Sequence, residues 1–181
     1  MGFRQKKISY FLDKLGSDSG SPGGGAAAAL TAAIGIALVE MVVRINSKRK
    51  NPTGGKSKAA RLKTLRRRME SVMDRDAAVF SKLSKLLKAK NRGTLYQTAL
   101  KAAAAVPFVI CKTVPEGLRL AKSEAAFTGR WLMSDLVESE SLLKAAFFTG
   151  KLNVEINLNE IEDQKFVLSK RRALAVWEKK L

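Results

Sequence analysis

The stretch "SDSGSPGGGAAAALTAAIGIALVEMVVR", residues Ser17 to Arg44, decides the fold. Its first nine residues are rich in Ser, Gly and Pro, which predicts a loop. Residues 26–45 follow as an Ala-rich, helix-like segment, and Glu40 is the only charge between positions 26 and 43. A helix that is apolar nearly all round is buried on most sides, and small residues let neighbouring helices approach closely. We therefore predict a buried inner helix over 26–45.

Other interpretations of this stretch are weaker. "GGGAAA" at 23–28 formally fits a dinucleotide-binding pattern, and "GGKS" at 54–57 resembles the end of a phosphate-binding loop. Neither follows a strand-like segment, and the second motif needs a glycine where the chain has Lys50. A membrane anchor is disfavoured because Ala adds little transfer energy and Glu40 lies inside the segment. The glycines then form either a flexible loop or an open helix start that offers backbone N–H groups to a ligand.

Composition limits the classes of function. A chain of 181 residues with 46% hydrophobic residues predicts one globular domain over 1–181. Histidine is absent and Cys111 is the only cysteine, which disfavours a transition-metal site, a His-based nucleophile and any internal disulfide. The thiol count and the absence of an export signal predict a cytoplasmic protein. The net charge of +18 favours anionic ligands without choosing among them.

Helical periodicity dominates the rest of the chain, so the predicted class is all-α, a bundle of long helices. Besides the inner helix we predict helices over 5–15, 58–90, 94–120, 124–148 and 163–180. Pro107 is expected to bend or break its helix. Apolar and polar residues alternate over 152–159, which predicts a short extended segment there.

Several motifs in order carry a family resemblance. After the helix-loop-helix start with "SPGGGAAAALTAAIGIALVEMV" come "DRDAAVF" at 74–80, "AAAVPF" at 103–108, "SDL" at 134–136 and "NVEINLNEIEDQKF" at 153–166. This arrangement resembles the formiminotetrahydrofolate cyclodeaminase and methenyltetrahydrofolate cyclohydrolase family over nearly the whole chain. Ala26 stands where the family usually has Ser, and Arg130 stands where it has Asn.

The resemblance implies folate one-carbon chemistry. Members close formiminotetrahydrofolate to methenyltetrahydrofolate with loss of ammonia, or hydrolyse methenyltetrahydrofolate to the formyl form. The reacting carbon is a cationic, amidine-type electrophile, so neither a metal nor a cofactor is required and the tetrahydrofolate derivative is the substrate. A carboxylate can stabilise that cation and move protons.

Two carboxylates are catalytic candidates. Asp76 falls on the apolar stripe of the predicted helix over 58–90, whereas Asp74 falls off it. A carboxylate on a core-facing position must be paired, hydrogen-bonded or protonated, which marks either a functional group or a structural ion pair. Asp135 lies at the edge of another apolar stripe, beside Arg130, and is either catalytic or an ordinary surface acid.

Polar groups for binding the pterin come from two segments. Asn153 and Asn157 share one face of the predicted extended segment and could hold the amide edge of a pterin. The predicted glycine turn would supply backbone donors, and its substrate-binding candidates are Ser21, Pro22, Gly23, Gly24 and Gly25. The predicted site lies where this turn, Asp76 and the two asparagines converge, with Asp135 as a further contributor.

The surface suggests partners and alternatives. The cationic excess suits the glutamate tails of polyglutamylated folates, and apolar surface beyond the needs of one small bundle predicts a homodimer. The segment 44–68 holds eleven Lys and Arg and no acid, which also suits a nucleic-acid-binding protein, although few aromatic residues are available for base stacking. An inactive family member that serves as a scaffold is the third alternative.

Overall fold

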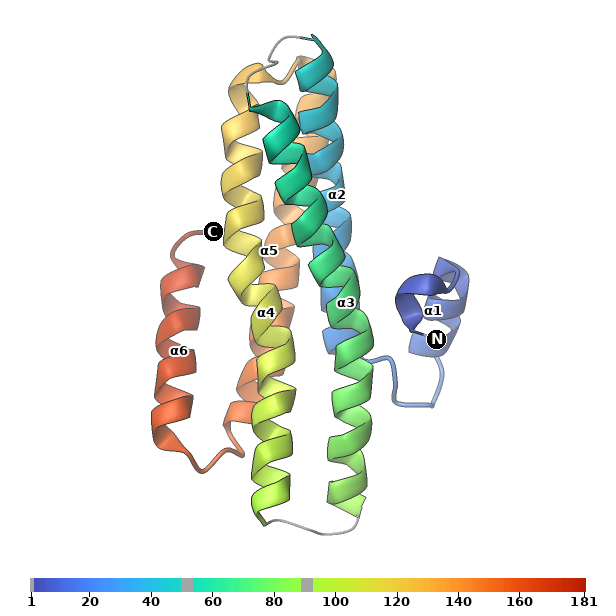
Figure 1. The fold of residues 1–181 in the computed structure, drawn as a ribbon, viewed down its shortest axis with the longest axis vertical. Coiled ribbons are helices and arrows are strands. Elements are labelled where there is room, and N and C mark those ends of the chain that lie inside the picture. The colour runs from blue at the N-terminus through green and yellow to red at the C-terminus, as the bar shows by residue number, and fades with distance from the viewer. Residues whose placement is uncertain (1, 50–53, 89–92) are drawn as a thin grey trace.

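The computed structural model describes residues 2–49, 54–88 and 93–181. The described residues form an all-helical bundle without strands, which confirms the predicted fold class (Figure 1). The helices are α1 (Ile8–Leu15), α2 (Gly24–Arg49), α3 (Gly55–Lys88), α4 (Thr94–Glu124), α5 (Arg130–Leu158) and α6 (Gln164–Glu178), with short 3-10 helices at Phe3–Gln5 and Ala125–Phe127.

Four long helices, α2 to α5, run up and down the long axis of the molecule (Figure 1). The helix α6 returns along the outside of α4, and α1 stands on the opposite side of the bundle. The helix α2 begins short of the lower end of the bundle, and α3 and α4 extend beyond its first turn (Figure 1). The start of α2 therefore lies alongside α3 and α4 rather than at their ends.

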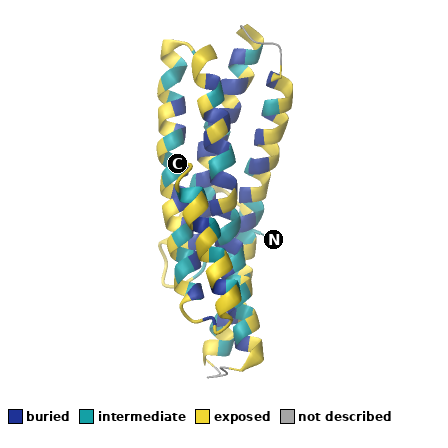
Figure 2. Cartoon of the chain, turned by 90° about the vertical axis from the view of Figure 1, so that its left-hand side faces the viewer, coloured by how far each residue is buried: buried dark blue, intermediate teal, exposed yellow. Residues whose placement is uncertain are grey.

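The predicted buried helix over 26–45 is confirmed and extends at both ends to form α2. Half of its residues are buried, and the long helices turn their buried faces toward one another (Figure 2). A Cβ on Gly35 would lie 3.0 Å from Leu143 Cγ, and a Cβ on Gly117 would lie 3.3 Å from Leu143 Cδ1. Small residues on α2 and α4 thus let both helices approach α5 closely.

By length and composition alone, two helical segments are apolar enough to cross a membrane, Gly24–Arg49 and Thr94–Phe127. Core helices of soluble proteins pass the same test, and most of the apolar window of α2 is buried inside the bundle. The apolar character of α2 is therefore explained by its place in the core.

Pro107 and Pro115 do not break α4, so of the two effects expected of Pro107, a bend or a break, the break is wrong. The helix continues from Thr94 to Glu124 through both prolines. Each proline removes one backbone donor, but Ala104, Ile110 and Cys111 on either side of Pro107 are fully buried in the core. The packing of both halves against the bundle outweighs the missing hydrogen bond.

The predicted extended segment over 152–159 is also wrong, because residues up to Leu158 belong to α5. The alternation hides two helical stripes, each with a spacing of four. Val154 and Leu158 are buried, whereas Leu152 and Ile156 are 62% and 59% exposed. Two apolar stripes on different helix faces, offset by two positions, imitate the period of a strand.

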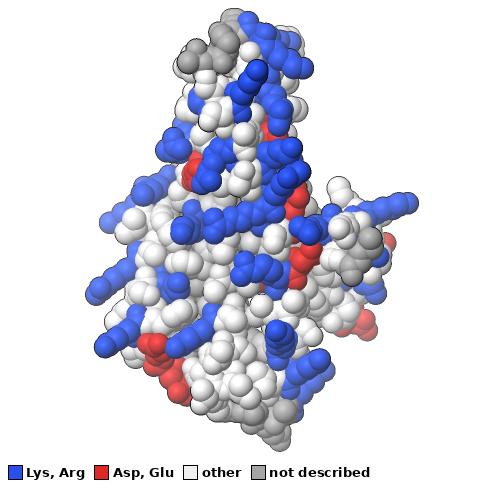
Figure 3. All heavy atoms as spheres, viewed as in Figure 1, with Lys and Arg blue, Asp and Glu red and all other residues white. Residues whose placement is uncertain are grey.

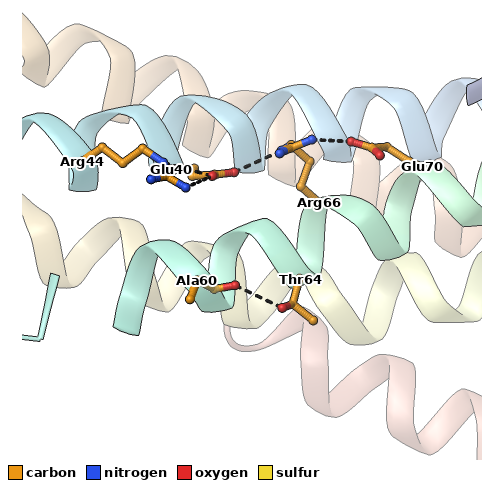
Figure 4. A network of polar contacts seen from close by, with 6 residues as sticks. All are labelled: Glu40, Arg44, Ala60, Thr64, Arg66 and Glu70. Atoms are coloured by element: carbon orange, nitrogen blue, oxygen red, sulfur yellow. Dashed lines mark hydrogen bonds and ion pairs between the residues drawn. The ribbon is translucent and has the colours of Figure 1, made fainter. Parts of the chain in front are cut away.

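An ion-pair network ties α2 to α3. Glu40, only 7% exposed, accepts hydrogen bonds from Arg44 one turn along and from Arg66 on α3, and Arg66 also pairs with Glu70 (Figure 4). Burial alone would raise the pKa of Glu40, but the two guanidinium groups lower it below its usual value. The one charge inside the apolar part of α2 is thus paired with two arginines.

Candidate functional site

A pocket lies beneath the first turn of α2, where α3, α4 and α5 pass it. It brings together most of the site residues predicted from the sequence. The lining residues are Gly20, Ser21, Gly23, Gly24, Gly25, Asp76, Val79, Phe80, Leu83, Ala103, Pro107, Asn153 and Asn157. Pro22 is buried behind this wall, after a cis peptide bond from Ser21, and does not line the pocket.

Asp76 reaches from α3 to the start of α2. Its carboxylate accepts a hydrogen bond from the backbone N–H of Ala26, and burial raises the pKa of Asp76 more than this bond lowers it. A Cβ on Gly25 would overlap the carboxyl group, with Asp76 Cγ 2.6 Å away. The glycine is therefore required for the close approach of the carboxylate to the backbone.

The two asparagines lie on α5, across the pocket from Asp76. They are four residues apart and remain on one helix face, as predicted. Asn153 Nδ2 donates to the Thr149 carbonyl oxygen at 2.8 Å, and Asn157 Nδ2 donates to the Asn153 carbonyl oxygen at 2.8 Å. These bonds orient both amides, and neither uses the side-chain carbonyl oxygen or the second N–H of the amide.

Sequence reasoning missed the apolar wall of the pocket. This wall consists of Val79, Phe80 and Leu83 on α3 and of Ala103 and Pro107 on α4. Phe80 reads as a core residue because it follows the apolar stripe of α3, yet it is 47% exposed. Its place in the pocket could have been inferred from the sequence, because Phe80 follows Asp76 by one turn and lies on the same side of the helix.

The structure does not bring Asp135 to the pocket. Asp135 and Asn153 are 18 positions apart on α5, which is roughly 27 Å along the helix axis. Asp74 also lies outside the pocket, where its carboxylate contacts Arg4 Nε at 3.5 Å. Within one chain, Asp76 is the carboxylate of the site.

Other reactive groups in the described parts of the chain are few. No group of three or more His, Cys, Asp or Glu side chains there could hold a metal ion. The buried Cys111 thiol, whose pKa burial raises to about 12, stays protonated at neutral pH and is therefore a poor nucleophile. The chemistry of the pocket thus depends on one carboxylate, two amides, Ser21 and backbone groups.

Comparisons with known proteins agree with this architecture. The family model described as formiminotransferase-cyclodeaminase matches residues 7–175. The pig formimidoyltransferase-cyclodeaminase is 30% identical over 94% of this chain, which spans only 34% of that protein. The methenyltetrahydrofolate cyclohydrolase of Methylorubrum extorquens is 29% identical, with 92% of this chain and 86% of that protein covered.

A solved structure shares the whole fold. The crystal structure of formiminotetrahydrofolate cyclodeaminase from Thermotoga maritima superposes with a TM-score of 0.90 at 27% identity, covering 97% of this chain and 90% of that one. Because the family model covers most of the sequence and the fold agrees over nearly its full length, this chain belongs to the formiminotransferase-cyclodeaminase family.

Proposed function

We propose that the pocket binds a tetrahydrofolate carrying a one-carbon unit, and that it cyclodeaminates the formimino form or hydrolyses the methenyl form. One observation carries this proposal: Asp76 is held against the first turn of α2 in a pocket that Ser21, Asn153 and Asn157 also line. The arrangement offers an acid–base group beside donors and acceptors for a pterin. The family membership of the chain supports the same substrate class.

Asp76 is the acid–base and cation-stabilising group of the proposed reactions. In cyclodeamination, N10 of the folate attacks the carbon of the protonated formimino group and loses its proton. That proton is transferred to the formimino nitrogen, which leaves as ammonia when its bond to the carbon breaks. In hydrolysis, water adds to the methenyl carbon and one ring carbon–nitrogen bond breaks. Both reactions pass a cationic carbon and move protons, which a nearby carboxylate assists.

The start of α2 and the asparagines are the proposed pterin contacts. Backbone N–H groups in the first turn of a helix have no partner within the helix. Those at Gly24 and Gly25 border the pocket, and they would donate to the pterin carbonyl. Asn153 and Asn157 would complete the contact as donors and acceptors to its amide edge.

Polyglutamylated folates are the proposed form of the substrate. The chain carries a net charge of +18. This cationic excess suits the carboxylates of a glutamate tail that leaves the pocket.

We further propose a homodimer formed through the outer faces of α2 and α5, in the cytoplasm. Ile34 and Met41 on α2 and Phe148, Leu152 and Ile156 on α5 are all exposed apolar side chains. Neighbouring exposed apolar side chains on two helices are typical of an interface. The dimer would bury them without involving the inner pocket wall formed by α3 and α4.

A catalytic role for Asp135 depends on such a dimer. Lys144 lies midway between Asp135 and Asn153 on α5. If two copies of α5 paired antiparallel about Lys144, Asp135 of one copy would lie opposite Asn153 of the other. Asp135 therefore remains a proposed contributor only across two chains.

Nucleic-acid binding has weaker support than the folate reaction. Lys and Arg side chains are spread along the whole visible face of the molecule rather than gathered in one groove (Figure 3). In the basic segment 44–68, Arg44, Lys58, Arg61 and Arg66 pair with acids of the bundle. Part of this charge is therefore structural.

An absorbance assay that follows methenyltetrahydrofolate tests the proposed function. The protein is expected to form this compound from formiminotetrahydrofolate or to consume it by hydrolysis. A salt-titrated binding measurement with duplex DNA, run beside it, tests the alternative. DNA binding without turnover of either folate would contradict the proposal, and inactivity in both assays would favour the scaffold.

A further inference from the structure

Phe80 is the exposed aromatic side chain of the pocket. Its ring is 47% exposed, although the periodicity of α3 places it beside core residues. Opposite the ring is Gly20, whose φ of +69° is a conformation that glycine adopts without strain. A Cβ on Gly20 would lie 3.9 Å from Phe80 Cε1, so the loop passes close to the edge of the ring.

The polar and apolar groups of the pocket are segregated along α3. Asp76, with its contact to the start of α2, marks the polar end. Phe80 follows one turn later, about 6 Å along the helix axis, and Leu83 follows Phe80. Ala103 on α4 also lines the pocket.

The substrate has the same order of groups. In methenyltetrahydrofolate the reacting carbon joins N5 of the pterin to N10, and N10 is bonded directly to the p-aminobenzoyl ring. A reacting carbon held at Asp76 therefore leaves the benzoyl ring within about one helix turn, which is the separation of Asp76 and Phe80 on α3.

We infer that Phe80 is the aromatic contact for the p-aminobenzoyl ring of the substrate. This inference rests on the proposed folate reaction and adds a residue that determines substrate affinity. Aromatic pairs prefer offset-stacked or edge-to-face geometry and gain free energy beyond burial of their area. Phe80 would supply that contact to the bound substrate and to the transition state alike.

Substitution of Phe80 tests the inference through steady-state kinetics. Phe80→Leu keeps an apolar side chain but removes the ring, so KM for the folate is expected to rise about three- to tenfold with kcat little changed. Phe80→Tyr retains the ring and should keep KM within about twofold of the wild type. Phe127→Leu, at a comparably exposed phenylalanine outside the pocket, is the matched control and should leave both constants unchanged.

Binding of substrate fragments distinguishes a direct contact between Phe80 and the benzoyl ring from a general disturbance of the pocket by the substitution. Titration calorimetry would measure p-aminobenzoylglutamate and, separately, 6-hydroxymethylpterin with each variant. Phe80→Leu is expected to weaken the binding of p-aminobenzoylglutamate by the same three- to tenfold. The affinity for the pterin fragment should not change.

Two results would overturn the assignment. Equal weakening of both fragments would show that Phe80 only maintains the pocket, and unchanged affinity for p-aminobenzoylglutamate would show no contact at all. Because fragment binding needs no turnover, these results are distinct from failure of the proposed reaction, which would appear as wild-type protein without folate activity.

Discussion

Replacement of Asp76 by asparagine is the sharpest perturbation of the proposed mechanism. The amide has nearly the same shape as the carboxyl group, fits beneath Gly25, and its oxygen can still accept from the Ala26 N–H. The substitution therefore removes the charge and the basicity of the side chain and leaves no cavity in the protein. Turnover should fall about 100-fold or more, the usual contribution of an acid–base group, which corresponds to roughly 2.7 kcal/mol of transition-state stabilisation.

The pKa of Asp76 gives this prediction a second readout. Burial raises its pKa in the folded protein, so the ionised carboxylate opposes folding at neutral pH and this cost disappears as pH falls. Asp76→Asn is therefore expected to raise Tm slightly at pH 7 while turnover collapses. In the wild type, kcat/KM should fall as pH drops through a pKa above the ordinary range of aspartate, and the variant should lose this acidic limb.

Asp74→Asn is the control for this experiment. Asp74 is two positions away on α3, outside the pocket, and contacts Arg4 near the N-terminus. Its loss should leave turnover nearly unchanged, because the ion pair does not touch the site. If Asp74→Asn abolished activity and Asp76→Asn kept it, the assignment of Asp76 as the acid–base group would be refuted. Folate binding by Asp76→Asn should change much less than its turnover.

Four further predictions concern the site, the bundle and the surface. Gly25→Ala places a methyl group on the Asp76 carboxyl, so turnover should fall at least about tenfold, measured in the same absorbance assay. Glu40→Gln leaves Arg66 without its buried carboxylate and should cost about 1–3 kcal/mol of unfolding free energy at pH 7. Because the folded pKa of Glu40 is lowered, this difference should shrink as pH falls through that pKa, as urea unfolding would show. Leu152→Lys places a charge on the proposed dimer face and should convert dimers to monomers in sedimentation. Salt should weaken binding of a polyglutamylated folate more than that of the monoglutamate, as titration calorimetry at two ionic strengths would show.

Each of these predictions has an outcome that would contradict it. Gly129→Ala is the control for Gly25→Ala, because a Cβ on Gly129 would meet open space. Equal losses of turnover in both variants would show that the loss at Gly25 is not due to displacement of the Asp76 carboxyl group. Glu140→Gln breaks a more exposed pair with Lys144 and should cost less than Glu40→Gln at pH 7. A wild-type protein that sediments as a monomer would refute the dimer. Equal salt dependence for the two folates would refute a role for the surface cations.

The sequence alone was sufficient for the central helix and for the carboxylate of the site. The segment 26–45 has no polar face, and such a helix is stable in water only inside a bundle, so burial of α2 followed from composition. Asp76 was recognisable because a carboxylate interrupts an otherwise apolar stripe. Asn153 and Asn157 were placed on one face correctly, since a spacing of four aligns side chains on both a strand and a helix.

The same spacing explains what the sequence could not decide. Over 152–158 a strand and a helix both satisfy the apolar pattern, and only packing selected the helix, because Val154 and Leu158 fill the core while Leu152 and Ile156 remain outside it. The exposure of Phe80 was equally undetermined, since a stripe predicts which way a side chain points but not whether a neighbour covers it. The helix α2 begins short of the lower end of the bundle (Figure 1), and at its start Phe80 of α3 lines a pocket instead of a core.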